Sequence, residues 1–201
     1  MARLDFDRWD YAATKLLLLV GLLGVPLVVV GLPLAAWAGG DALVWPAVLE
    51  EQARVTSPAL RDGASAAWDG GAEVTLADAS GTLWLLTLLP ALVVAAAAPL
   101  VTGPLLGLVR TIQRGESFSD AAVRRLRVVG LTLLLAPWAH HALTGIANAA
   151  VLEEAFGQEF WFSVVIPAGT LAISALGLAL GAVAEAFRQG ARLRDDVEGL
   201  V

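Results

Sequence analysis

Two adjacent histidines in the middle of an uncharged stretch are the first residues of this chain that could do chemistry. His140 and His141 lie within residues 128–152, which contain no Asp, Glu, Lys or Arg. Thr144 and Asn148 follow at helical spacing, so they would share a polar stripe with His141. Ionisable groups inside a membrane are costly and functional by default, so one interpretation is a proton or solute path. The preferred interpretation is a neutral, hydrogen-bonded pair that holds two helices together, because the stretch lacks the carboxylate that a permease usually needs.

Arginines form a second candidate region. Arg124, Arg125 and Arg127 stand close together, and Arg192 and Arg194 lie near the C-terminus. Such residues attract anionic lipid, at about 1 kcal/mol each, or dock an acidic cytosolic partner. The alternative is that they only set the membrane topology. We do not expect direct nucleic-acid binding, because the basic stretch is short and has no helix that could read bases.

Motifs for catalysis are missing. The sequence contains no G-x-S-x-G, no H-E-x-x-H, no phosphate-binding loop and no dinucleotide fingerprint, and it has no cysteine. Two histidines without a third ligand make a poor zinc site. We therefore expect a protein that is not an enzyme and that carries neither a cofactor nor a metal.

Four long apolar stretches must position these residues. The chain has 201 residues and is 58% hydrophobic and 16% charged, against about 45–50% and about 25% in typical globular proteins. About 20 apolar residues cross a bilayer. The predicted fold is an all-α membrane protein, a single integral membrane domain over residues 1–201 with four transmembrane helices. These helices are expected at about residues 12–38, 82–113, 120–152 and 160–188.

The basic residues also predict how the chain is threaded. Eleven of the thirteen lysines and arginines lie in three polar pieces, which are residues 1–15, 110–127 and 185–201. Positively charged segments stay cytoplasmic, so both termini, the inner loop at 114–119 and the tail at 189–201 are expected inside the plasma (inner) membrane. The outer loops are then about 39–81 and 153–159, and the second carries only acidic charges. The first apolar run exceeds the core of a signal peptide and is expected to remain as a span.

The long outer loop is expected to form a small extracytoplasmic cap between the first and second helices. Residues 46–55 fit a short helix that begins at a proline. Further on, Asp69 and Gly70 precede the alternating run 73–78, which is a hairpin signal. The cap is therefore predicted to be part strand.

The inner ends of the second and fourth helices resemble each other. Residues 108–120 align with residues 183–195 at a constant offset, and each copy ends an apolar helix at a glycine, Gly115 or Gly190. Glycine commonly ends a helix, so both are predicted helix stops, and Phe118 would then anchor at the inner interface. The chain is interpreted either as a tandem repeat of two helix pairs or as a chance similarity of helix ends.

Two glycine pairs indicate where helices pack. Gly103 and Gly107, and likewise Gly177 and Gly181, are four residues apart and allow close approach of backbones. We expect tight packing within the chain, and a homo-oligomer is the alternative.

Two further signals lie at the inner helix ends. Ser117 and Asp120 fit a capping box, which predicts that the third helix begins near Asp120. Glu185 is expected to pair with Arg188 on its own helix or with Arg110 on the second helix, or to extend to water.

The inner-loop and tail residues carry a family resemblance. Gly115-x-x-Phe118 with Arg124-Arg125-Leu126-Arg127, together with the ending Ala186-Phe187-Arg188-x-Gly190, are similar to the bacterial membrane family catalogued as domain of unknown function 2975. The resemblance implies four spans over essentially the whole chain and no established activity. Genes of this family often lie beside a small helix-turn-helix regulator, which implies a membrane partner of transcriptional control.

The expected function is that of a non-enzymatic sensor in the lipid bilayer, or a regulatory partner of a cytosolic, DNA-binding protein. Two alternatives stay open. One is a small permease, or an ion- or proton-translocating protein, that uses His140 and His141. The other is a purely structural membrane protein.

Overall fold

The computed structural model describes residues 8–47, 64–68, 72–113 and 119–198. The chain divides into two compact units. Unit 1 comprises residues 1–27, 94–138 and 167–201, and unit 2 comprises residues 28–93 and 139–166.

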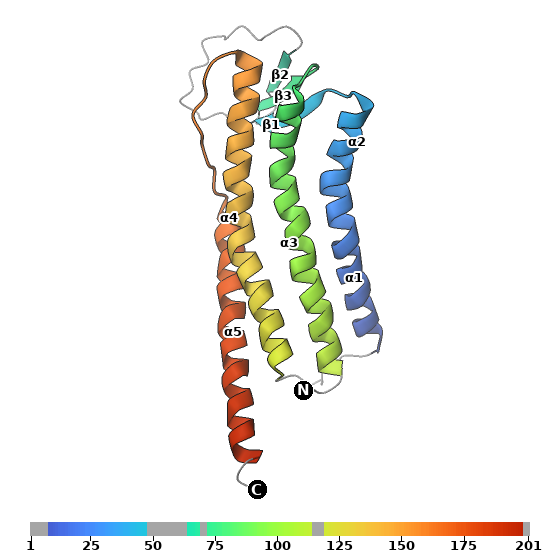
Figure 1. The fold of residues 1–201 in the computed structure, drawn as a ribbon, viewed down its shortest axis with the longest axis vertical. Coiled ribbons are helices and arrows are strands. Elements are labelled where there is room, and N and C mark those ends of the chain that lie inside the picture. The colour runs from blue at the N-terminus through green and yellow to red at the C-terminus, as the bar shows by residue number, and fades with distance from the viewer. Residues whose placement is uncertain (1–7, 48–63, 69–71, 114–118, 199–201) are drawn as a thin grey trace. The chain divides into compact units, whose positions relative to one another are not determined.

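Within the described residues, four helices are long and apolar enough to cross a membrane (Figure 1). The first consists of α1 (Arg8–Pro26), the π-helical turn η1 (Leu27–Gly31) and α2 (Leu32–Gly39). The other three are α3 (Gly81–Gln113), α4 (Asp120–Phe156) and α5 (Ala168–Glu198). At 1.5 Å per residue, α3 and α4 are about 50 and 55 Å long, which exceeds the ~30 Å hydrocarbon core of a bilayer. The predicted fold class is confirmed.

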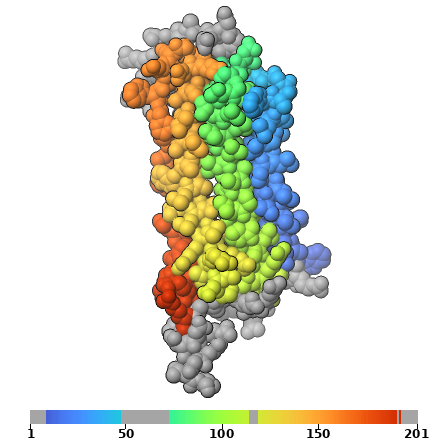
Figure 2. Space-filling view, viewed as in Figure 1, coloured from blue at the N-terminus to red at the C-terminus, as the bar shows by residue number. Residues whose placement is uncertain are grey.

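Large apolar side chains cover the outside of these helices. Leu17 and Leu27 of the first span are each 72% exposed, and Leu135 of α4 and Leu178 of α5 are each 61% exposed. Figure 2 shows that α1 (blue), α3 (green) and α4 (yellow to orange) all contribute to the surface in this view. Water-soluble monomers rarely expose large contiguous apolar patches. We therefore treat the chain as a multi-pass membrane protein whose outer solvent is lipid.

A three-stranded antiparallel sheet lies in unit 2. Its strands are β1 (Leu43–Ala47), β2 (Ala64–Trp68) and β3 (Ala72–Leu76), in the order β1-β3-β2. The predicted hairpin is confirmed as the β2–β3 pair. The short helix predicted from Pro46 is wrong at its start, because Pro46 and Ala47 belong to β1, an edge strand where a missing N–H is tolerated. The rest of that predicted helix lies outside the described residues.

The core of unit 2 forms between this sheet and the helix ends that carry it. Strand alternation directs Leu43 of β1 and Val74 of β3 inward, against Leu83 and Trp84 of α3 and Val151 of α4. All five side chains are at most 6% exposed. The sheet is thereby anchored to α3 and α4, and the ring of Trp37 on α2 stacks on that of Trp84 with centroids 6.1 Å apart.

The core of unit 1 joins α3, α4 and α5. Leu108 of α3, Val123 and Leu126 of α4 and Ala184 of α5 form one buried cluster. Partly buried residues at helical spacing, Leu105 on α3 and Leu180 and Phe187 on α5, pack against this cluster, so each helix contributes one apolar stripe to the core.

The close approach of α4 and α5 depends on Gly130 and Gly177. A Cβ built at Gly177 would lie 2.6 Å from the carbonyl oxygen of Gly130, and a Cβ at Gly130 would lie 2.8 Å from the carbonyl oxygen of Gly177. No larger residue fits at either position without moving a backbone. The expected tight packing at Gly177 is confirmed. Gly181, its predicted companion, has open space where a Cβ would be.

The fourth helix starts later than predicted. It was expected from about residue 160, but α5 begins at Ala168, after Pro167. Proline disfavours helical backbone in the residue before it and is accepted in a first turn, and the Thr170 N–H donates to the Pro167 carbonyl at 2.9 Å. Residues 158–167 therefore form a non-helical connection that is longer than the predicted loop at 153–159.

The fourth helix also ends later than predicted, and the helix stop at Gly190 is wrong. α5 continues through Gly190 to Glu198, because one glycine costs a helix only about 1 kcal/mol and the following Ala, Arg and Leu residues favour helix. Glycines with positive φ occur instead at Gly40 after α2 and at Gly157 after α4. The other predicted stop, Gly115, lies outside the described residues.

Candidate functional site

Arg125 is used inside unit 1, where it links α4 to α3. Its Nη1 donates to the carbonyl oxygen of Gly107 at 3.0 Å and to the hydroxyl of Thr111. The Thr111 hydroxyl in turn donates to the Gly107 carbonyl at 2.9 Å. The Arg125 guanidinium therefore has partners on its own chain, which argues against a role in docking another molecule.

Arg127 belongs to an ion-pair network with α5. Its Nη2 lies 3.3 Å from Oε2 of Glu185, and Nε of Arg188 donates to the same oxygen at 2.8 Å. Of the three alternatives for Glu185, the structure shows the pairing with Arg188, and Arg127, not Arg110, is the second cationic partner. Such exposed pairs add little stability individually, and one carboxylate shared by two guanidiniums leaves the network with a net positive charge.

Arg124 differs from both of these neighbours. Its side chain is exposed, and it makes no hydrogen bond or ion pair with any residue that the structure describes. Arg192 is likewise exposed on α5. Arg194 lies in α5 beyond the described side chains, and Phe118 lies outside the described residues. Of the predicted contact residues, Arg124 and Arg192 therefore remain available to a partner or to lipid.

One of the two midplane histidines, His140, binds the backbone of a neighbouring helix. Nδ1–H of His140 donates to the carbonyl oxygen of Pro90 on α3 at 3.1 Å, and the rings of His140 and His141 meet edge to face with centroids 5.2 Å apart. Thr144 donates to the His140 carbonyl of its own helix. Asn148 is buried, 7% exposed. The contact between His140 and Pro90 favours the interpretation that the pair holds α3 and α4 together.

A cross-helix hydrogen bond explains the tryptophan in the middle of α4. Nε1 of Trp138 donates to the hydroxyl of Ser174 on α5 at 2.9 Å. The Ser174 hydroxyl donates in turn to the carbonyl oxygen of Leu134, at 3.4 Å. Polar groups in hydrocarbon need internal partners, and this chain of bonds provides them.

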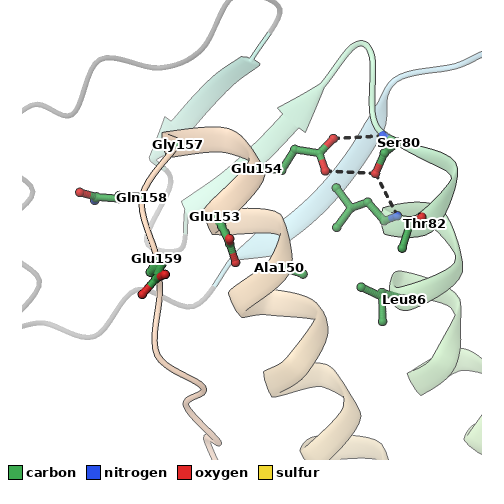
Figure 3. A pocket seen from close by; sticks show the side chains of 10 residues that line it. Ser80, Thr82, Leu86, Ala150, Glu153, Glu154, Gly157, Gln158 and Glu159 are labelled. Atoms are coloured by element: carbon green, nitrogen blue, oxygen red, sulfur yellow. Dashed lines mark hydrogen bonds between the residues drawn. The ribbon is translucent and has the colours of Figure 1, made fainter.

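A cavity of about 440 Å³ lies in unit 2 between the start of α3 and the end of α4 (Figure 3). Its polar lining residues are Ser80, Thr82, Glu153, Glu154, Gln158 and Glu159. The described residues of unit 2 contain no lysine or arginine, so the cavity is chemically suited to a cation or a hydrogen-bond donor. Nowhere in the described parts of the chain do three His, Asp or Glu residues come together as metal ligands.

One wall of this cavity is held by a cap that crosses between helices. Oε1 of Glu154 accepts from the Ser80 N–H at 3.0 Å, and its Oε2 accepts from the Ser80 hydroxyl at 3.2 Å (Figure 3). The Ser80 hydroxyl accepts from the Leu83 N–H at 3.2 Å. Ser80 is thus the N-cap of α3, and Glu154 supplies from another helix the carboxylate of a capping box. Sequence reasoning missed this cavity because its walls are more than 70 residues apart; the acidic second outer loop was the only signal.

A glycine on α4 brings the non-helical connection alongside that helix. A Cβ built at Gly145 would lie 2.4 Å from the carbonyl oxygen of Ser163 and 2.9 Å from Cε2 of Phe162. Gly145 precedes the last residue of α4, Phe156, by three helical turns. The connection therefore runs back along α4 for part of its length, a path that the sequence did not indicate.

Comparison with known proteins identifies a family. A family model described as "Protein of unknown function (DUF2975)" matches residues 42–201. The match covers the sheet and the last three spans, a shorter part of the chain than the resemblance implied. Comparisons with curated proteins and with solved structures find no significant match.

Proposed function

We propose that this chain, which belongs to the DUF2975 family of proteins of unknown function, is a non-enzymatic sensor or regulatory partner of a cytosolic protein. The proposal rests on one observation: neighbouring arginines on α4 differ in whether they have partners within the chain. Arg125 and Arg127 have partners within the chain, whereas Arg124 is exposed without one among the described residues. Arg124 is therefore the arginine of this group whose charge can meet acidic groups of another molecule.

The end of α5 supports the same proposal. Residues 191–198 carry five charged side chains, which are costly in hydrocarbon, and α5 continues through them to Glu198 with Arg192 exposed. A helix that projects beyond the hydrocarbon offers a surface to a soluble protein. The partner would present acidic groups to Arg124 and Arg192, because charge complementarity steers association and specificity.

The proposal requires that both termini face the cytoplasm of a bacterial cell. Four spans return the chain to the side on which it started, and the arginine-rich pieces favour the inner side of the plasma membrane. The sheet of unit 2 would then be extracytoplasmic.

This orientation predicts the labelling of single cysteines in a chain that has none of its own. With Asp78→Cys, a membrane-impermeant maleimide should label intact cells, whereas Arg192→Cys should be labelled only after the cells are opened. Asp78 and Arg192 are both exposed, so burial does not distinguish them. Labelling of Arg192→Cys in intact cells would contradict the proposed threading.

Partner binding depends on Arg124 in this proposal. Arg124→Glu should reduce the cytosolic protein recovered with the tagged, full-length chain by roughly tenfold or more, because like charges at an interface cost several kcal/mol. Glu73→Lys is the matched control, since Glu73 is exposed on β3, on the proposed outer side. The same proteins recovered with both variants and with the unaltered chain would discard the proposal.

The permease hypothesis has less support. A permease needs a midplane site that exchanges protons or solute. His140, however, is hydrogen-bonded to the Pro90 carbonyl and so links α4 to α3. Polar contacts of this kind in membranes contribute about 0.6 kcal/mol on average. We therefore assign the histidines to packing and the arginines to recognition.

A further inference from the structure

Gly107 of α3 is small because an arginine of α4 lies against it. A Cβ built at Gly107 would be 2.5 Å from Nε of Arg125, 2.8 Å from its Cζ and 3.0 Å from its Cδ. A methyl group and the guanidinium cannot occupy this place together. The same guanidinium donates to the Gly107 carbonyl and to the Thr111 hydroxyl, so it is fixed both by shape and by hydrogen bonds.

The glycine pair Gly103 and Gly107 therefore does not bring two helix backbones into contact. Gly103 has nothing within 4 Å of the place where its Cβ would be, and of the two glycines only Gly107 lies against a side chain of another helix. Gly107 leaves room for the Arg125 side chain. Gly107 and Thr111 together form the seat of Arg125 on α3. The buried side chains of Leu108 and Val123 lie in the same cluster of unit 1 and supply the apolar part of the contact between α3 and α4.

We infer that Arg125 is a positioning residue, and that its seat on α3 sets the rotation of the first turns of α4 and so presents Arg124 outward. Consecutive residues of a helix are about 100° apart around its axis. With Arg125 held against α3, Arg124 is directed away from that contact and is exposed. This inference rests on the proposed function for the role of Arg124 in binding, although the positioning itself does not.

The shape of the seat favours arginine. Both hydrogen bonds come from one nitrogen, Nη1, and a lysine ammonium also has several N–H donors. Lysine therefore retains the charge and the donors, but it lacks the planar guanidinium that lies over Gly107. Arg125→Lys should therefore restore the positioning only in part.

A spin label tests the position of Arg124 without any partner. The chain has no cysteine, so a nitroxide attached to Arg124→Cys is unique in the full-length protein. We expect a single spectral component, of the mobility usual for an exposed helix site, in the otherwise unaltered chain and with Gly103→Ala. A second component of different mobility should appear with Gly107→Ala and with Arg125→Ala, and a smaller one with Arg125→Lys.

The double variant distinguishes a seat from general damage. Gly107→Ala should change the spectrum no further once Arg125→Ala is present, because there is no guanidinium left to displace; such coupling marks residues in direct contact. Equal spectra for Gly103→Ala and Gly107→Ala, or additive effects in the double variant, would overturn the inference. Size-exclusion chromatography in detergent keeps the comparison to folded protein.

A parallel recovery of partner separates this inference from the proposed function. If both hold, Gly107→Ala and Arg125→Ala reduce the recovered partner, while Gly103→Ala leaves it at the level of the unaltered chain. A changed spectrum with no partner lost by Arg124→Glu removes the proposed function and leaves the positioning role. An unchanged spectrum together with loss of the partner in Arg124→Glu removes the positioning role and leaves the proposed function.

Discussion

Gly177→Ala is expected to destabilise the protein by about 1–3 kcal/mol, the usual cost of overpacking. The added Cβ would lie 2.6 Å from the Gly130 carbonyl oxygen and 2.8 Å from the Leu134 backbone nitrogen. Both obstacles are backbone atoms of α4, so neither can turn aside as a side chain would. Thermal unfolding in detergent, followed by circular dichroism, measures the loss.

Gly181→Ala is the matched control on the same helix, one turn further along. It has open space at the Cβ position, and alanine is a better helix former than glycine by about 1 kcal/mol. Its unfolding midpoint should stay the same or rise. Equal losses for the two variants would mean that α4 and α5 do not cross at Gly177.

Gly145→Ala is expected to push the connection at 158–167 away from α4. The new Cβ would lie 2.4 Å from the carbonyl oxygen of Ser163, far inside contact distance, and the connection lacks the regular hydrogen bonds that hold a helix in place. Since the connection moves more easily than α4, the variant should open this contact while the helices persist.

Cysteine labelling measures that opening. Ser163→Cys should react slowly with a maleimide in the unaltered background and several-fold faster together with Gly145→Ala. Gly169→Ala is the control, because nothing lies within 4 Å of its Cβ position. If Gly145→Ala labels at the rate of the Gly169→Ala control, the connection does not pack on α4 at this glycine.

The prediction of four spans succeeded because it depends on composition alone. Uncharged, apolar runs of 25 residues or more are long enough to cross a bilayer as helices, and the observed α3, Gly81–Gln113, agrees closely with the predicted range. The start of α4 at Asp120 is also as predicted, and Ser119 accepts there from the Ala122 N–H. The capping role predicted for Ser117 lies outside the described residues.

The limits of the fourth helix were predicted less well because two local signals compete there. Pro167 lies inside an apolar run that could be helical on either side of it, and the run Phe160–Ile166 is rich in aromatic and β-branched residues, which favour extended backbone. Gly190 has the chemistry of a helix stop, but continued helix costs it little when good helix formers follow. The start and the end of α5 therefore each depend on several residues together and not on one proline or one glycine.

Sequence by itself determined the solvent of this protein and the number of its membrane crossings, because both follow from where charge is absent. It also located the arginines, although not their separate tasks. Only the tertiary structure decided that Arg125 fits over Gly107, that Arg127 pairs with Glu185 and that Arg124 stays exposed. The reason is geometric: side chains of the same type, adjacent in sequence, point about 100° apart on a helix, and what each one meets depends on helices that lie far away along the chain.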